Sequence, residues 1–312
     1  MNRLSKSNLC GLLGITRQKY YRSCWSLENK RKTADQVVAM VDNIRMTQPR
    51  IGTRKLYYLL QKELNCLNVG RDKLFDILRA NHMLITPLRS YHVTTNSHHR
   101  FRKHKNIIAD MEITRPEQVW VSDITYIGQR DNHMYLSLIT DAYSKKIMGY
   151  DISSSLSTDG SLRALKMAAS NRSYPKNNLI HHSDRGVQYC SDIYQRALTK
   201  YKITTSMTES YDPYANAVAE RINGVLKQEF LLEQYNVPID VMKAVVKDVV
   251  EIYNKQRPHY SCGYLTPEQM HRQSERKIKT YKKSQSPKQI ILRKFTFVFS
   301  YDFQKSFTKT HI

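Results

Sequence analysis

The chain has 312 residues, of which 40% are hydrophobic, so it is long enough for one large globular domain and a smaller one. Its formal net charge of +23 indicates a polyanionic partner. No apolar run approaches the roughly 20 residues of a membrane span, and the run 9–15 is too short for a secretory signal. We therefore expect no membrane association.

The charge is unevenly distributed along the chain. Residues 1–115 contain 22 Lys+Arg and 8 Asp+Glu, residues 116–274 contain 18 and 17, and residues 275–312 contain 10 and 2. The acids therefore concentrate in a nearly neutral middle, between two basic flanks. This layout is typical of a catalytic domain between polyanion-binding arms, although solvated basic flanks are the alternative.

Cysteine and histidine usage favours a reduced protein without structural zinc. The chain has five cysteines, an odd number, and none forms a Cys-x-x-Cys pair. The pairs His98-His99 and His181-His182 have no cysteines at zinc-ligand spacing. We expect a cytoplasmic chain without disulfides.

The first predicted elements form a helix-turn-helix over residues 9–22. Gly14 marks the turn, and Thr16 is a plausible N-cap for the second helix. That helix would present Arg17, Lys19 and Arg22 to DNA.

A second helix-turn-helix candidate covers residues 53–63 and 69–79, with its later helix starting near Gly70 or Asp72. That helix carries Arg71 and Lys73, which are further candidate DNA contacts. An ordinary helical hairpin is the alternative. We interpret residues 1–90 as an all-helical DNA-binding region, followed by a basic linker over 91–114.

From residue 115 the pattern changes to alternating strands and helices. Polar turns separate the first three predicted strands, which should form an antiparallel meander. The strand and helix pattern predicts an α/β domain over 115–275, with a mixed sheet and helices on its faces. The predicted strands are 119–127, 134–139, 146–152, 179–183 and 203–206, and the predicted helices are 158–171, 192–200, 212–232 and 237–253.

Three acids stand out in this domain. Asp123 lies within a β-rich apolar run, Asp184 ends a strand before Arg-Gly, and Glu220 lies on a predicted helix. A lone acid in a strand is more often an ion-pair partner than a ligand, but a charge in an apolar run is costly unless it is paired or coordinated. Three carboxylates from two strands and a helix can hold a pair of Mg²⁺ ions for phosphoryl transfer.

Two further residues share the helical face of Glu220. Asn223 follows it by three positions and Lys227 by seven, so both are candidate contacts to a DNA end. Taken alone, Lys227 would be interpreted as a surface charge.

Together these motifs resemble the transposases of bacterial insertion sequences, in the IS-three group, whose catalytic core is of the retroviral-integrase type. The resemblance covers about residues 40–270. It rests on the segments Trp120–Tyr126, His182–Tyr189, Asn216–Lys227, Tyr253–His259 and Leu265–Glu268.

The resemblance implies an RNase H-like core in which Asp123, Asp184 and Glu220 bind two Mg²⁺ ions, with Mn²⁺ as a possible substitute. Lys227 would contact DNA, as would Arg257 and His259 of the later motif. The expected partners are double-stranded DNA (the terminal inverted repeats and the target), further copies of the chain on DNA, and a product of an upstream reading frame. The implied location is the bacterial cytoplasm, on the nucleoid.

Two features depart from the family pattern. The loop before the glutamate helix, Glu209–Tyr214, contains no glycine, and the basic tail 276–312 does not resemble the usual short ending. Two other functions stay open: an inactive DNA-binding regulator, and an RNase H-like nuclease. Neither explains all the features, because a regulator does not need the three acids and a nuclease does not need two helix-turn-helix candidates.

Overall fold

A computed structural model describes residues 5–86, 104–109, 111–129, 133–208 and 217–277 of the chain. The chain divides into two compact units, Met1–Ile278 and Lys279–Ile312, and the second lies outside the described residues. Among the described helices, none has the length and apolar character needed to cross a membrane.

The predicted turn separates the first two helices, although the first of them begins at Lys6, ahead of the predicted motif. Helix α1 (Lys6–Leu12) and helix α2 (Arg17–Arg45) are separated by a turn in which Gly14 has a φ of 64°. The Thr16 hydroxyl accepts a hydrogen bond from the backbone N–H of Lys19 and caps α2. Helix α2 continues for 29 residues, well beyond the predicted motif, because its sequence contains no glycine or proline to interrupt it.

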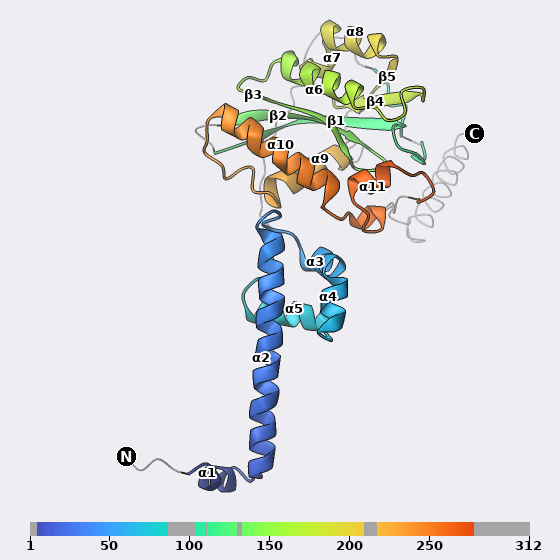
Figure 1. The fold of residues 1–312 in the computed structure, drawn as a ribbon. Coiled ribbons are helices and arrows are strands. Elements are labelled where there is room, and N and C mark those ends of the chain that lie inside the picture. Colours follow the sequence, from blue (N-terminus) through green and yellow to red (C-terminus); the bar gives the residue numbers. More distant parts are fainter. Residues whose placement is uncertain (1–4, 87–103, 110, 130–132, 209–216, 278–312) are drawn as a thin grey trace, which may run out of the picture. The chain divides into compact units, whose positions relative to one another are not determined.

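Three shorter helices pack beside α2 (Figure 1): α3 (Thr53–Leu59), α4 (Gln61–Cys66) and α5 (Arg71–Ala80). The single helix predicted over 53–63 is divided at Leu60, whose φ and ψ of −97° and 14° leave the helical region. Gly70, one of the two predicted starts, is the N-cap of α5. The shared core of these helices consists mainly of Val37, Val41, Leu56, Leu64, Leu74 and Leu78.

The α/β domain contains a mixed five-stranded sheet, as predicted. Strands β1, β2 and β3 form an antiparallel meander, and β1 also pairs in parallel with β4, which pairs in parallel with β5. The strand order β3-β2-β1-β4-β5 places β1 at the centre. The strands are β1 (Val119–Ile127), β2 (Met134–Asp141), β3 (Ile147–Ser153), β4 (Leu179–Ser183) and β5 (Ile203–Met207).

Helices cover both faces of this sheet (Figure 1). On one face Trp120 and Ile124 pack with the helices α6 (Thr158–Ser170), α7 (Val187–Cys190) and α8 (Asp192–Lys200). On the other face Leu136 and Leu138 pack with α9 (Ala217–Gln228) and α10 (Ile239–Lys255). Alternation of side chains along each strand divides the core in this way. A 3-10 helix (Tyr260–Cys262) and α11 (Pro267–His271) follow.

The structure changes two predicted boundaries. The backbone N–H of Met207 donates to the carbonyl of Lys105 at 3.3 Å, and Ile107 donates to the Ser206 hydroxyl at 3.1 Å, so part of the predicted linker lies along β5. Helix α9 ends at Gln228 rather than near 232, because Leu231 adopts a φ of 61°. The predicted start of that helix, 212–216, lies outside the described residues.

A cluster of charges around Glu229 joins α3 to the end of α9. The Glu229 carboxylate accepts hydrogen bonds from Lys55 at 2.7 Å and from Arg257 at 2.8 and 2.9 Å. Burial disfavours its charge, but Arg257 and then Lys55 outweigh that cost and lower its pKa to about 2. Burial and the charge of Arg257 lower the pKa of Lys55 to about 8. The Glu229 backbone carbonyl also accepts from Arg50 N–H at 3.1 Å.

We expect Glu229→Gln to lower the free energy of unfolding at pH 7 by about 2–4 kcal/mol, because two partly buried cations would lose their counterion. The pKa of Glu229 is lower in the folded state, so its contribution is full above about pH 4.5 and is lost as pH falls toward about 2. Urea denaturation should therefore show a smaller difference in the free energy of unfolding between wild type and Glu229→Gln at pH 3 than at pH 7. The control Glu251→Gln removes an exposed pair with Lys255 and should change stability by less than about 1 kcal/mol.

Candidate active site

Asp123 and Asp184 are brought together by the register of two parallel strands. Ser122 on β1 pairs with Ser183 on β4, so the next residues along these strands are the two aspartates. Side chains at matched positions of neighbouring parallel strands point to the same face, with the strands about 4.8 Å apart. Two carboxylates therefore lie next to each other where the parallel pairing of β1 and β4 stops, although β1 itself continues to Ile127.

Helix α9 brings the third acid to the same place. The Asn223 side-chain amide donates to the Asp123 carboxylate at 2.7 Å, and Glu220 lies one helical turn before Asn223 on the same face. Asn223 is buried, whereas Glu220 is exposed. Asn223, which the sequence predicts as a DNA contact, is thus hydrogen-bonded to Asp123 in the structure.

The electrostatics of Asp123 reflect this crowding. Burial is the largest cause that raises its pKa to about 7, and the charges of Asp184 and Glu220 add to it. The Ile124 backbone N–H, at 2.9 Å, and the Asn223 amide act in the opposite direction without cancelling the rise. A carboxylate in this setting gains from a nearby cation, which would stabilise its charged form.

The donor set fits a hard divalent cation, because it consists of carboxylates. However, in the part of the chain that the structure describes, no three His, Cys, Asp or Glu side chains are arranged as a preformed metal cluster. One Asp123 oxygen is engaged by Asn223 and the other by Ile124 N–H, while an Asp184 oxygen accepts from Gly186 N–H at 3.1 Å. Sharing one ion would therefore require these side chains to rearrange.

A buried polar layer lies next to the two aspartates, which the sequence patterns did not reveal. The His181 imidazole is hydrogen-bonded to the Ser122 hydroxyl at 2.7 Å and to the Tyr194 hydroxyl at 2.9 Å. Burial, and then the neighbouring His182, lower the pKa of His181 to about 3, so its ring is neutral. The ring packs between β1 and α8 and fixes the position of the strand ends.

Arg257 and His259, which the sequence predicts as DNA contacts, are both buried in the structure. Arg257 is only 2% exposed and is committed to Glu229, and its guanidinium lies 5.6 Å from the centre of the Tyr253 ring. His259 is buried and hydrogen-bonded to the Tyr253 hydroxyl at 2.9 Å. Burial, followed by the charge of Arg257, lowers the pKa of His259 well below its usual value, so both residues serve the interior.

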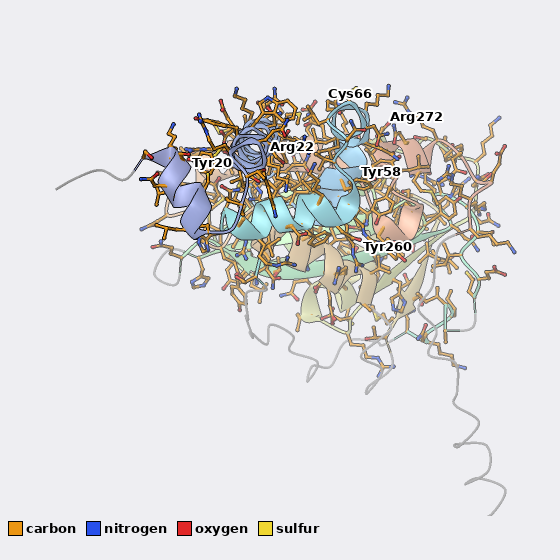
Figure 2. All side chains as sticks on the ribbon, turned by 90° about the horizontal axis from the view of Figure 1, so that it is seen from below. Tyr20, Arg22, Tyr58, Cys66, Tyr260 and Arg272 are labelled. Atoms are coloured by element: carbon orange, nitrogen blue, oxygen red, sulfur yellow. The ribbon has the colours of Figure 1, made fainter. Side chains whose placement is uncertain are left out.

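The remaining predicted DNA contacts lie at or near the surface. The Lys227 side chain is only 13% exposed and forms an ion pair with Glu233 at 2.7 Å. Arg71 pairs with its neighbour Asp72 at 2.9 Å. Arg22 lies near Tyr20 on α2 (Figure 2), and the exposed set comprises Arg17, Lys19, Arg22, Arg71 and Lys73.

Comparison with known proteins agrees with this architecture. Two protein-family models, both described as "Integrase core domain", match residues 113–213 and 201–267. The chain is 33% identical over 264 residues to the uncharacterized 31 kDa protein of insertion element IS600 from Shigella sonnei, with 83% of this chain and 96% of that protein covered. It is 28% identical over 269 residues to transposase InsF for insertion sequence IS3A from Escherichia coli (strain K12), covering 84% and 92%.

Solved structures also resemble part of the chain. The HTLV-2 integrase catalytic core domain in complex with magnesium (trimeric form) matches with 20% sequence identity and a TM-score of 0.40, covering 50% of this chain and 97% of that chain. Because this score is below 0.5, the family assignment depends on the sequence relatives instead.

We expect Asp123→Asn to stabilise the chain at pH 8 by roughly 2–4 kcal/mol in the presence of a chelator. The folded-state pKa of Asp123 is raised to about 7, so its favourable contribution is full below about pH 4 and is lost as pH rises through about 7. Asparagine cannot ionise and avoids this loss.

Chemical denaturation between pH 5 and pH 8 would measure the difference between variant and wild type. The exposed Asp240, replaced by Asn, provides a control at a surface carboxylate. An Asp123→Asn advantage of equal size at pH 5 and pH 8 would show that Asp123 does not titrate among other acids.

Proposed function

This chain belongs to the insertion-sequence transposases of the IS-three group, and we propose that Asp123, Asp184 and Glu220 are the acids through which it cuts and joins DNA. As a member of that family it is a DNA transposase, a polynucleotidyl transferase of the DDE type with an RNase H-like core. The family assignment does not favour an inert regulator or an RNase H-like nuclease. One observation carries the proposal for the acids: Asp123 and Asp184 directly follow Ser122 and Ser183, the last residues at which β1 and β4 pair, and Asn223 on the helix of Glu220 donates to Asp123.

The three acids would hold divalent metal ions, with Mg²⁺ the proposed species and Mn²⁺ as a substitute. When bound, such ions activate the attacking oxygen and neutralise charge on the phosphate. Asp123 and Asp184 present oxygens from the rigid sheet, whereas Glu220 comes from a helix. The hydrogen bond from Asn223 would hold the Asp123 carboxylate in place until the carboxylate oxygens bind a metal ion.

The proposed reaction first cuts one strand at the end of the element and leaves a 3′-OH, which then attacks the target DNA. The chain's contribution is to position the DNA and the carboxylates, because phosphoryl transfer needs little covalent chemistry from the protein. Lys227 is proposed to contact the DNA close to the acids, which would require it to exchange Glu233 for a phosphate. The proposed DNA partners are the terminal inverted repeats and the target, bound by several copies of the chain and by an upstream-frame product.

We expect Asp184→Asn to reduce Mg²⁺-dependent cleavage of an element end by at least about a hundredfold, as is usual when one group that stabilises transition-state charge is removed. DNA binding should stay within about twofold, because the proposed phosphate contacts are the exposed arginines of α2 and α5 and do not include Asp184. Gel assays with labelled terminal DNA would measure both quantities.

The control is Asp192→Asn, which changes an exposed acid at the start of α8. Its cleavage rate should equal that of wild type. Retained cleavage by Asp184→Asn would remove this residue from the proposed triad.

We further propose that the N-terminal helices recognise the element ends. The double variant Arg17→Ala/Arg22→Ala should weaken binding to terminal DNA and lower the slope of log K against log salt by roughly 1.8, about 0.9 for each phosphate that is no longer neutralised. Fluorescence anisotropy at several salt concentrations would give the slope. Lys243→Ala, an exposed cation on α10, is the control. An unchanged slope in the double variant would show that other residues neutralise the phosphates.

A further inference from the structure

A pocket of about 440 Å³ lies between the helices α3 and α5 and the segment that follows α10. Its described lining consists of four tyrosines, two arginines and a glutamine, and it contains no acidic residue. Five of these seven residues lie in the second helix-turn-helix candidate, but only Arg71 among them is a predicted DNA contact. The residues that carry the argument are Arg54, Tyr58, Arg71, Tyr260 and Tyr264.

The tyrosines form an ordered aromatic wall. The Tyr58 and Tyr264 rings are stacked, with centroids 5.0 Å apart and planes 17° from parallel. Tyr260 meets Tyr264 edge to face at 5.6 Å. Tyr58 and Tyr260 keep 41% and 43% of their surface exposed, so these rings are accessible to a ligand.

The backbone holds Tyr264 in an unusual conformation. Its φ is 66°, a left-handed value that is uncommon for a bulky residue, and its N–H donates to the His259 carbonyl at 2.8 Å. Strain of this kind persists where the surrounding structure enforces it and is concentrated at functional sites. In this chain the residue with the left-handed backbone, Tyr264, is also the one whose ring stacks on Tyr58. Tyr58 comes from a segment about 200 residues earlier in the chain.

The two arginines make the pocket attractive to an anion. Among the described residues, Arg54 is exposed and has no hydrogen-bond or ion-pair partner, whereas Arg71 has its sequence neighbour Asp72. The Arg71–Asp72 pair is largely exposed and is therefore weak and easily exchanged. A guanidinium group binds phosphate through paired N–H donors.

We propose that this pocket binds one unpaired nucleotide of the DNA substrate, with its base against the tyrosines and its phosphate on Arg54 and Arg71. Aromatic side chains bind unstacked bases through their ring faces, and a nearby cation binds the backbone. The pocket volume lies within the range of small-molecule sites. The proposal rests on the proposed function, since it assumes that DNA is the bound substrate.

The position of α3 gives the pocket a connection to the catalytic domain. Lys55 precedes Tyr58 by one helical turn and is bound to Glu229 at the end of α9. A nucleotide held on Tyr58 would thus be anchored to the helix that carries Glu220. The pocket would capture an unpaired base as the DNA end is opened for cutting.

The test uses the full-length protein, without divalent metal, and a DNA duplex that ends in one unpaired 2-aminopurine nucleotide. Wild-type protein should quench the fluorescence of this base by stacking. Tyr58→Ala should abolish the quenching and raise Kd for this DNA at least about fivefold, while Kd for the blunt duplex changes less than about twofold. Tyr58→Phe keeps the ring and should behave as wild type.

Arg54→Gln should raise the same Kd without removing a ring, which keeps the test valid if Tyr58→Ala does not fold. Tyr235→Ala, at a tyrosine 36% exposed and outside the lining, is the matched control and should leave the quenching unchanged. Absence of quenching by wild type, or equal behaviour of wild type, Tyr58→Ala and Arg54→Gln, would overturn the proposal.

Two further measurements complete the test. The first distinguishes a DNA nucleotide from a free nucleotide, and the second distinguishes the pocket proposal from the proposed acidic triad. If free 2-aminopurine deoxynucleoside monophosphate is quenched as strongly as the DNA at equal concentration, the pocket is a site for free nucleotides and the DNA assignment is wrong. Asp184→Asn should quench like wild type, because the pocket does not need the acids. Cleavage by Asp184→Asn would therefore contradict the proposed triad while leaving the pocket proposal intact.

Discussion

The properties of the candidate active site depend on the repulsion among carboxylates beside its central parallel strand pair. Asp123 and Asp184 are adjacent because β1 and β4 are in register, and Glu220 adds a third negative charge from α9. Without a metal, Asp123 relies on two hydrogen-bond donors, Ile124 N–H and the Asn223 amide. These donors do not cancel the rise in the pKa of Asp123 that burial and the neighbouring carboxylates cause. A cation bound at the site would therefore stabilise the charged form of Asp123.

Helix α9 connects that site to the N-terminal helices. Glu220 lies in its first turn, and Glu229 directly follows its last residue. Lys55 and Arg257 fix Glu229, so one end of the helix is held by charge while the other end carries a catalytic candidate. Movement of α3 on DNA binding would therefore act on α9 through Lys55, which offers a physical route between DNA recognition and the site.

The basic character of the chain serves two purposes. Some cations are used internally, as with Arg257 on Glu229 and Arg172 on the buried Glu117 at 2.9 Å. Others, such as Arg17, Arg22 and Arg54, are exposed and remain available for a polyanion. Net charge alone does not separate these groups, because an arginine that is 2% exposed and one on the surface count equally.

The sequence by itself determined the five strands, the cap of α2 at Thr16, the mixed sheet and the acids to examine, because alternation, capping and turn chemistry act over a few residues. The tertiary structure decided which polar residues face inward. In the tertiary structure Arg257 and His259 are buried, the Asn223 amide donates a hydrogen bond to Asp123, and the Tyr58 ring stacks on Tyr264. These pairings join residues far apart in sequence, and no local pattern specifies them, since packing of whole helices against the sheet sets which side chains meet.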